Sequence, residues 1–287
     1  MRFVDLLNFG ENQLKKIAGE DAKLESELLL LESFGLTKKQ LLQLLRDPIP
    51  SKQNHRLFLR QLSLRLLGTP IAYILKKTEF RGHSYKVCPK VFIPRPETEL
   101  LVEEAITSLT PPPLTVIEIG VGSGIIGIEL GLAWPESKIY GWDLSAKAIQ
   151  TASRNAAQLK VKNIHFFHNN FFKDTTNWKK LLKSNKSVLI VTNPPYVQRE
   201  TIKTLDSSIQ NFEPKRALDG GASGVAFYKR LFRELLSIKS FTLICEIGYD
   251  QKEALTNLLH TLGFSHFYFK KDYNNLDRIL IIKKPRV

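Results

Sequence analysis

The segment VIEIGVGSGIIGIEL, residues 116–130, passes from one apolar run through closely spaced glycines into another apolar run. Gly120, Gly122 and Gly124 have no β-carbon, so backbone N–H groups in this turn can approach a ligand closely. A strand, a glycine turn and a helix form the repeating unit of parallel α/β sheets. The segment therefore predicts an α/β fold with a ligand site at the turn.

The rest of the chain continues this alternation. Apolar runs of strand length are separated by amphipathic runs of helix length, which predicts a mostly parallel sheet covered by helices on both faces. Ligands of such sheets bind beyond the carboxyl ends of the strands. The predicted strands are 116–119, 139–142, 164–167, 188–191, 243–247, 264–269 and 279–282, and the predicted helices are 124–134, 146–159, 224–237 and 250–262.

The chain before this segment has different patterns. Thr37 and Gln40 have the spacing of a capping box ahead of a leucine-rich run, and residues 1–72 as a whole predict a small helical domain. Residues 73–93 then change to Tyr, Phe and Val around the turn residues Arg-Gly-His, which predicts a linker with a β-hairpin. The α/β domain is expected over residues 94–287.

Composition limits the partners and the compartment. The chain has 42 Lys and Arg against 28 Asp and Glu, a net charge of +14 that favours acidic partners or nucleic acid, although no run of five like charges occurs. Cys88 and Cys245 lie far apart without His or Cys at metal-ligand spacing, so we expect a reducing cytoplasm and no metal site. No apolar run approaches about 18 residues, so we expect no membrane segment.

The glycine turn fits two kinds of cofactor. Gly122, Gly124 and Gly127 have the spacing of a dinucleotide fingerprint, and Asp143, about 20 residues on, is placed to accept hydrogen bonds from the hydroxyls of a ribose. Glu118 distinguishes the two, because a carboxylate so close to the turn would repel an anionic pyrophosphate. A cationic aminoacyl sulfonium would instead be attracted to it.

A second motif follows another buried run, in VLIVTNPPYVQ, residues 188–198. Pro194 and Pro195 fix the backbone and lack N–H groups, so their turn offers carbonyl acceptors and no donors. Asn193 adds a side-chain carbonyl and Tyr196 an aromatic face. These groups predict a site for a planar group that carries an NH2, held by acceptors on both hydrogens while its nitrogen faces a reactive carbon.

With these motifs, the sequence resembles the class I S-adenosylmethionine methyltransferases that have an Asn-Pro-Pro-Tyr motif. Within them it is most similar to the release factor glutamine methyltransferases of the HemK or PrmC family. The resemblance implies a Rossmann-like sheet of seven strands behind a small helical domain and a β-hairpin linker. The segments that carry it are FIPRPETELLVEEA at 92–105, EIGVGSG at 118–124, NPPY at 193–196, FEPKRALDGGASGVAFY at 212–228 and DYNNLDRIL at 272–280.

The resemblance also implies the reaction and the residues that perform it. The expected reaction transfers a methyl group to the side-chain amide nitrogen of the Gln in a release factor's Gly-Gly-Gln motif, with the helical domain docking that protein. Asn193, Pro194 and Tyr196 are the expected catalytic residues, and with Pro195 they hold the substrate Gln. The residues expected to bind S-adenosyl-L-methionine are Glu118, Gly120, Val121, Gly122, Ser123, Gly124, Asp143, Phe171 and Asn193.

Several alternatives remain open at this level. Phe171 is the expected neighbour of the adenine, but Phe172 is adjacent and could take that place. An adenine-N6 methyltransferase of DNA or RNA shares the Asn-Pro-Pro-Tyr motif and suits the basic charge, although no additional target-recognition domain is evident. An NAD-dependent oxidoreductase is opposed by Glu118, and an inert binding protein by the intact motifs. Glu213 and Arg216 are expected to order the loop after the motif rather than to act in catalysis.

Overall fold

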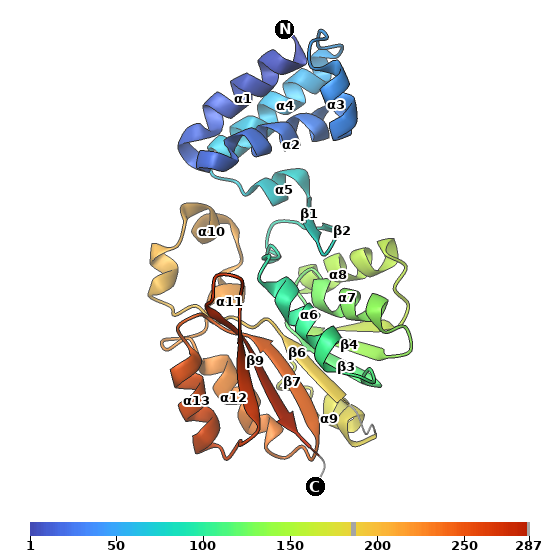
Figure 1. Ribbon diagram of the computed structural model, residues 1–287, viewed down its shortest axis with the longest axis vertical. Coiled ribbons are helices and arrows are strands. Elements are labelled where there is room, and N and C mark those ends of the chain that lie inside the picture. Colours follow the sequence, from blue (N-terminus) through green and yellow to red (C-terminus); the bar gives the residue numbers. More distant parts are fainter. Residues whose placement is uncertain (185–187, 286–287) are drawn as a thin grey trace. The chain divides into compact units, whose positions relative to one another are not determined.

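Residues 1–184 and 188–285 are described by the computed structural model, which divides into two units (Figure 1). The helical unit comprises Met1–Lys77 together with Asp206–Phe212. The sheet unit comprises Thr78–Leu205 and the chain from Glu213 onward. The ends of the predicted 94–287 domain, 286 and 287, lie outside the described residues.

The helices of the helical unit begin and end where the sequence has capping residues. The predicted capping box is confirmed, because Thr37 Oγ1 accepts from the Gln40 N–H at 3.3 Å and Gln40 Oε1 accepts from the Thr37 N–H at 2.8 Å. Gly35, with φ of 64°, closes the preceding helix. The helices are α1 (Phe3–Ala18), α2 (Ala22–Phe34), α3 (Lys38–Leu44), α4 (Lys52–Leu66), α5 (Ile71–Leu75) and α10 (Ser207–Phe212), with a 3-10 turn η1 at Gly19–Asp21.

An apolar core and one buried ion pair hold these helices together. Leu6 of α1, Leu29 of α2 and Phe58 of α4 are fully buried in the same cluster. Arg65 of α4 donates two hydrogen bonds to Glu25 of α2, at 2.7 and 3.0 Å. This two-pronged pairing fixes the register of α2 against α4, because a guanidinium and a carboxylate match in only one orientation.

The sheet unit is built on seven strands in the order β5-β4-β3-β6-β7-β9-β8. All neighbours are parallel as far as β7, and β9 runs antiparallel between β7 and β8. The sequence prediction of a mostly parallel sheet is therefore confirmed. The strands are β3 (Thr115–Ile119), β4 (Lys138–Asp143), β5 (Ile164–His168), β6 (Val188–Thr192), β7 (Phe241–Glu246), β8 (Phe267–Lys271) and β9 (Asp277–Lys284).

Helices cover both faces of this sheet, and each face has its own apolar core. One layer is α6 (Thr98–Ser108), α7 (Ile125–Ala133) and α8 (Ala146–Gln158), and the other is α9 (Thr175–Ser184), α12 (Ala226–Leu235) and α13 (Lys252–Thr261). The sequence analysis did not predict α9. Its segment is rich in lysine, and the apolar signal was short: Trp178 with Leu181 and Leu182, three and four residues further on, which pack in one core. Short pieces complete the unit: β1 (Lys77–Phe80), β2 (His83–Lys86), η2 (Thr201–Thr204) and α11 (Lys215–Leu218).

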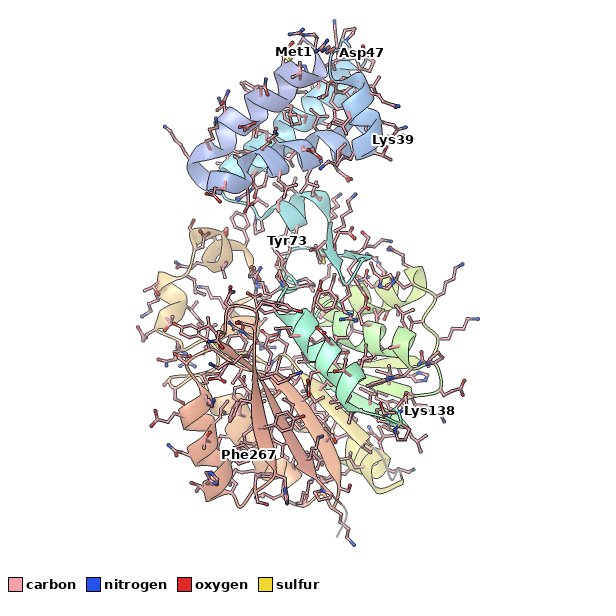
Figure 2. The ribbon with its side chains drawn as sticks, in the orientation of Figure 1. Met1, Lys39, Asp47, Tyr73, Lys138 and Phe267 are labelled. Carbon is pink, nitrogen blue, oxygen red and sulfur yellow. The ribbon has the colours of Figure 1, made fainter. Side chains whose placement is uncertain are left out.

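The parallel strands give the sheet two chemically different ends. Lys138 and Phe267, the first residues of β4 and β8, mark its amino end (Figure 2). The glycine turn and the Asn-Pro-Pro-Tyr segment follow β3 and β6 at the opposite, carboxyl end. Among the described residues, no helix is both long enough and apolar enough to cross a membrane.

Candidate active site

The pairing of the central parallel strands brings four residues to one edge of the sheet. β3 lies between β4 and β6, and β7 pairs with β6 on its other side. Because these registers are aligned, the residues at or just after the carboxyl ends lie side by side. They are Asp143 at the end of β4, Gly120 after β3, Asn193 after β6 and Glu246 at the end of β7. The sequence analysis predicted the first three.

The glycine turn after β3 is open on one side and packed on the other. Gly120 and Gly122 have φ of 77° and 57°, and a β-carbon on Gly122 would meet no atom within 4 Å. Gly124, with φ of 87°, packs so closely on α8 that a β-carbon would lie 2.8 Å from that of Ala152. The first two glycines therefore leave the open side of the turn free of side chains, while their own N–H groups donate to the Trp142 carbonyl and to Asp143. The third glycine allows α7 to approach α8.

The other two residues of this turn contribute backbone only. The side chains of Val121 and Ser123 are buried, so the cofactor contacts predicted for them are limited to main-chain atoms. Asn155 of α8 fixes the turn by donating from Nδ2 to the Ser123 carbonyl at 2.8 Å. The same amide bonds the backbone of Lys86 through both of its ends, at 2.8 and 3.0 Å. One side chain thus joins the glycine turn to the hairpin strand β2.

Asp143 is held in place by two backbone donors. Its carboxylate accepts from the Gly122 N–H at 2.9 Å and from the Ser145 N–H at 2.8 Å. Burial raises the pKa of this carboxyl above its usual value, and these hydrogen bonds oppose the rise. A carboxylate has about four acceptor positions, so these donors do not use all of them. The ribose contact stays a prediction, and Ser145 rather than Asp143 caps α8 by accepting from the Ala148 N–H at 3.2 Å.

Glu118 lies below the turn, between β3 and α7, rather than on its open side. Its carboxylate is fully buried beside Gly127, where a β-carbon would lie 2.4 Å from Oε2. It approaches the Gly127 N–H, but among the described residues neither of its oxygens makes a hydrogen bond. Burial raises its pKa to about 8. An unpartnered carboxylate beside an open glycine turn fits a ligand that carries positive charge.

The raised pKa of Glu118 makes a testable contribution to stability. The folded-state pKa is about 8 against 4.5 for the free side chain, so the folded state holds this proton more tightly than the unfolded state. The resulting contribution to the free energy of unfolding is fully present below pH 4.5 and is lost as pH rises toward 8. We expect Glu118→Gln to reduce the loss of unfolding free energy between pH 5 and pH 8 by on the order of 3 kcal/mol. Urea denaturation at several pH values measures this. The exposed Glu200→Gln is the control, and parallel curves for wild type and Glu118→Gln would contradict the assignment.

The two phenylalanines after β5 have different surroundings. Phe171 is 3% exposed and stacks on Trp178, with ring centroids 4.7 Å apart and planes 17° apart. Phe172 is half-buried, and the Arg230 guanidinium lies 4.3 Å from its ring centroid. The structure gives Phe171 a packing role in the core. An adenine contact by either ring stays a prediction.

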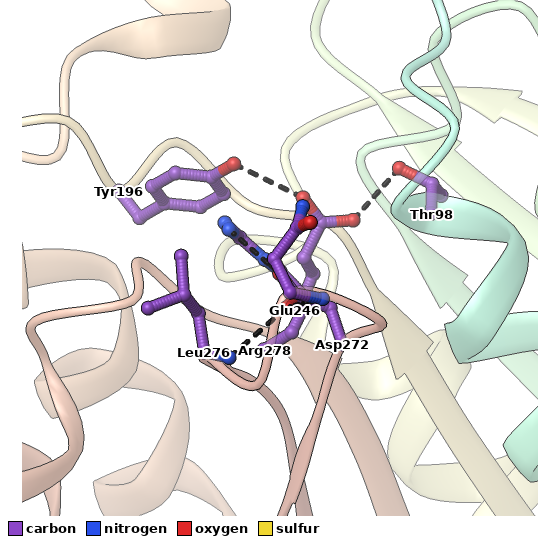
Figure 3. Close-up of polar contacts among 7 residues, drawn as sticks. Thr98, Tyr196, Glu246, Asp272, Leu276 and Arg278 are labelled. Atoms are coloured by element: carbon purple, nitrogen blue, oxygen red, sulfur yellow. Dashed lines mark hydrogen bonds and ion pairs between the residues drawn. The ribbon is translucent and has the colours of Figure 1, made fainter.

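The Asn-Pro-Pro-Tyr segment is tied to α6 and β7 by its two polar side chains. Asn193 Nδ2 donates to Thr98 Oγ1 at 3.0 Å. The Tyr196 hydroxyl donates to Glu246 Oε1 at 3.0 Å, and the Thr98 hydroxyl donates to Glu246 Oε2 at 2.7 Å (Figure 3). Gln251, the N-cap residue of α13, supports the segment by donating to the Tyr196 carbonyl at 2.9 Å.

Sequence reasoning missed Thr98, Glu246 and Gln251. Glu246 left one signal, a carboxylate inside an apolar strand, in the segment TLICEIG at 242–248. Such a residue needs a buried partner. Glu213 has the loop-ordering contacts that were expected for it, because its buried side chain forms an ion pair with Arg95 and accepts from the Ile93 N–H at 3.4 Å.

The fold and this edge of the sheet define a methyltransferase. A family model described as "Methyltransferase small domain" matches residues 96–218, and one described as "PrmC N-terminal domain" matches residues 5–75. Among solved structures, the hMettl16 catalytic domain in complex with MAT2A 3′UTR hairpin 6 has a TM-score of 0.54 at 16% identity, covering 77% of this chain and 81% of that chain. This likeness shows the fold alone.

Relatives identify the family. The release factor glutamine methyltransferase of Enterococcus faecalis is 32% identical over 283 residues, which cover 98% of both chains. The release factor glutamine methyltransferase of Clostridium botulinum is 31% identical over 286 residues, again 98% of both chains. The chain belongs to the release factor glutamine methyltransferase family.

Proposed function

We propose that this protein transfers a methyl group from S-adenosyl-L-methionine to the N5 side-chain amide nitrogen of the glutamine in the Gly-Gly-Gln motif of peptide chain release factors. The observation that carries the proposal is the placement of Asn193 beside the open glycine turn: a β-carbon on Gly120 would lie 3.9 Å from the Asn193 carbonyl. An amide-binding segment and a cofactor turn therefore meet at one edge of the sheet. Family membership supports the same reaction.

The residues of the turn suit this cofactor. The open side of the turn from Gly120 to Gly124 would receive it, with acceptor positions of Asp143 for the ribose hydroxyls. Glu118 below the turn would offset the positive charge of the sulfonium and become ionised more readily as it does so. When bound, the cofactor supplies an electrophilic methyl carbon on a good leaving group.

The protein's own task is to orient a poor nucleophile. The amide lone pair is delocalised, and full loss of that resonance costs about 18 to 20 kcal/mol. Two hydrogen bonds to the NH2 contribute about 1 to 3 kcal/mol each, so they cannot offset this cost alone. Holding the nitrogen in a near-attack geometry contributes about 7 to 11 kcal/mol. The free Asn193 Oδ1 and the carbonyls of the two prolines supply the acceptors that orient it.

The reaction needs no strong base from the protein. A bound S-adenosyl-L-methionine would supply the methyl group to this nitrogen and would leave as a neutral thioether, taking the electron pair of its methyl–sulfur bond. The nitrogen is then acidic and releases one proton to water. Tyr196, held by its hydrogen bond to Glu246, would supply an aromatic ring that can lie against positive charge during this step.

We further propose that residues 1–72 dock the release factor, that residues 73–93 form the linker and hairpin, and that residues 94–287 form the catalytic domain. Three leucines on or just after α4 support docking, because Leu57, Leu64 and Leu67 are 40%, 39% and 76% exposed. Contacts remote from the reacting glutamine can supply the binding energy that positions it.

A labelling experiment tests the function. The full-length protein is incubated with methyl-labelled cofactor and either a purified release factor or nucleic acid, and the label is located by peptide mapping. We expect label on the Gln of the Gly-Gly-Gln peptide and none when that Gln is replaced by Glu. Label on adenine would favour nucleic acid methylation, to which the charge of +14 is suited, and absence of label on the peptide would contradict the proposal.

A further inference from the structure

Glu246 is a buried acid whose two carboxylate oxygens are both engaged. It is 1% exposed at the end of β7. Oε2 accepts from the Thr98 hydroxyl at 2.7 Å and Oε1 accepts from the Tyr196 hydroxyl at 3.0 Å. Its backbone carbonyl accepts from the Tyr228 hydroxyl at 2.7 Å, which fixes the strand end itself. The carboxylate therefore joins α6 to the Asn-Pro-Pro-Tyr segment (Figure 3).

The direction of these hydrogen bonds determines how Asn193 is oriented. A threonine hydroxyl has one hydrogen, and Thr98 donates it to Glu246. Its oxygen can then only accept from Asn193, and it does so from Nδ2 at 3.0 Å. Oδ1 of Asn193 is thereby directed away from Thr98, as an acceptor for the substrate's NH2.

We propose that Glu246 is a positioning residue for the methyl transfer, which acts through the Thr98 hydroxyl to set the orientation of the Asn193 amide and through its second oxygen to hold Tyr196. This inference rests on the proposed function. It extends that function, because neither Glu246 nor Thr98 lies within the Asn-Pro-Pro-Tyr motif. An ionised Glu246 accepts from both hydroxyls. A protonated Glu246 donates one hydrogen, which reverses the bond to Thr98 and lets Thr98 donate to Asn193 Oδ1.

The charge of Glu246 depends on groups from several elements. Burial raises its pKa above the usual value, and the hydrogen bonds from Thr98 and Tyr196 oppose this rise. Arg278 of β9 also lowers the pKa, while it forms an ion pair with Asp272 in the β8–β9 turn at 3.2 Å. Glu97, before α6, raises it. The folded-state pKa is therefore raised, so turnover is expected to rise with pH as this carboxyl ionises.

The first test is Glu246→Gln, which keeps the shape of the side chain but replaces one of its two acceptor oxygens by an NH2 donor. Its amide can accept from one hydroxyl and must present N–H to the other. We expect kcat to fall roughly 10- to 100-fold, the range for groups that orient a functional side chain. We also expect an unchanged cofactor Kd by calorimetry and the loss of the acidic limb of the pH–kcat profile. A wild-type kcat and pH profile would overturn the proposal.

A pair of substitutions at Thr98 tests separately whether Glu246 acts on Asn193 through the Thr98 hydroxyl, a connection that we call the relay. Thr98→Ser keeps the hydroxyl and should retain most of the turnover, whereas Thr98→Val removes it and should lower kcat as Glu246→Gln does. Calorimetric binding of the cofactor by each variant reports whether the site is folded. Equal turnover in the Ser and Val variants would contradict the relay, because only the hydroxyl distinguishes them in hydrogen bonding.

A readout without catalysis separates this inference from the proposed function. The Nδ2 resonances of Asn193 in the 15N-labelled full-length protein should shift with pH as Glu246 ionises, and Glu246→Gln should abolish the shift. If the wild type methylates no glutamine, the proposed function fails while this titration still tests the relay. A pH-independent Asn193 amide in the wild type would overturn the inference.

Discussion

Replacement of Asn193 by alanine is expected to lower kcat for glutamine methylation by about 1000-fold and to leave the Kd of S-adenosyl-L-methionine nearly unchanged. In the proposed reaction the side chain supplies the acceptor that orients the substrate's NH2, since its donor end is already bonded to Thr98. The open glycine turn, which is the proposed cofactor site, does not depend on that side chain. Single-turnover kinetics and calorimetry measure the two quantities.

The control for this prediction is Asn257→Ala, at an exposed position on α13, which should alter neither quantity. Asn193→Asp is a second comparison, because it keeps the size of the side chain but cannot donate to Thr98. It should therefore also lose turnover. If Asn193→Ala weakens cofactor binding as much as it lowers kcat, the residue shapes the cofactor pocket rather than orienting the substrate.

The glycine turn gives the second large effect, because its members should fail in different ways. Gly124→Ala should lower the free energy of unfolding by about 3 kcal/mol, since the new β-carbon would lie 2.8 Å from that of Ala152 and φ is 87°. Gly122→Ala should cost only about 1 kcal/mol, because its φ is 57° and no atom lies within 4 Å. It should nevertheless raise the cofactor Kd about tenfold or more, as the β-carbon projects into the ligand's space.

Chemical denaturation and calorimetry on both variants measure this separation. A Gly122→Ala protein that is as unstable as Gly124→Ala would show that the turn is packed on both sides. A Gly122→Ala protein with unchanged cofactor affinity would show that the cofactor does not lie over this turn. Gly263→Ala, at a turn with φ of 78° and no neighbour within 4 Å, controls for backbone strain alone.

Much of the site could be predicted because parallel strands align their carboxyl ends. Apolar runs located β3, β4 and β6, and the residues that follow such runs had to meet at one edge. Gly120, Asp143 and Asn193 were found in this way, and the register confirms that they are neighbours. Local chemistry was equally informative at Thr37, where capping depends on residues three apart.

The rest depends on contacts between distant parts of the chain. Thr98 and Glu246 are 148 residues apart, and nothing in either segment alone indicates that they meet. The packing of Phe171 was not evident either, because its partner Trp178 belongs to α9, a lysine-rich helix that the pattern did not reveal. Strand alternation explains why Glu118 points toward α7. Its burial could not be predicted, because it depends on the close packing of Gly127 in α7 against the Glu118 carboxylate.

Asn155 gives the cofactor turn an unusual dependence on a segment outside the ligand edge. Its single amide bonds both strand β2 and the Ser123 carbonyl, so both segments depend on the position of this one side chain. A shift of the hairpin can therefore be passed to the glycine turn through Asn155. Under the proposed function, this contact would couple the hairpin to the lifetime of the bound cofactor.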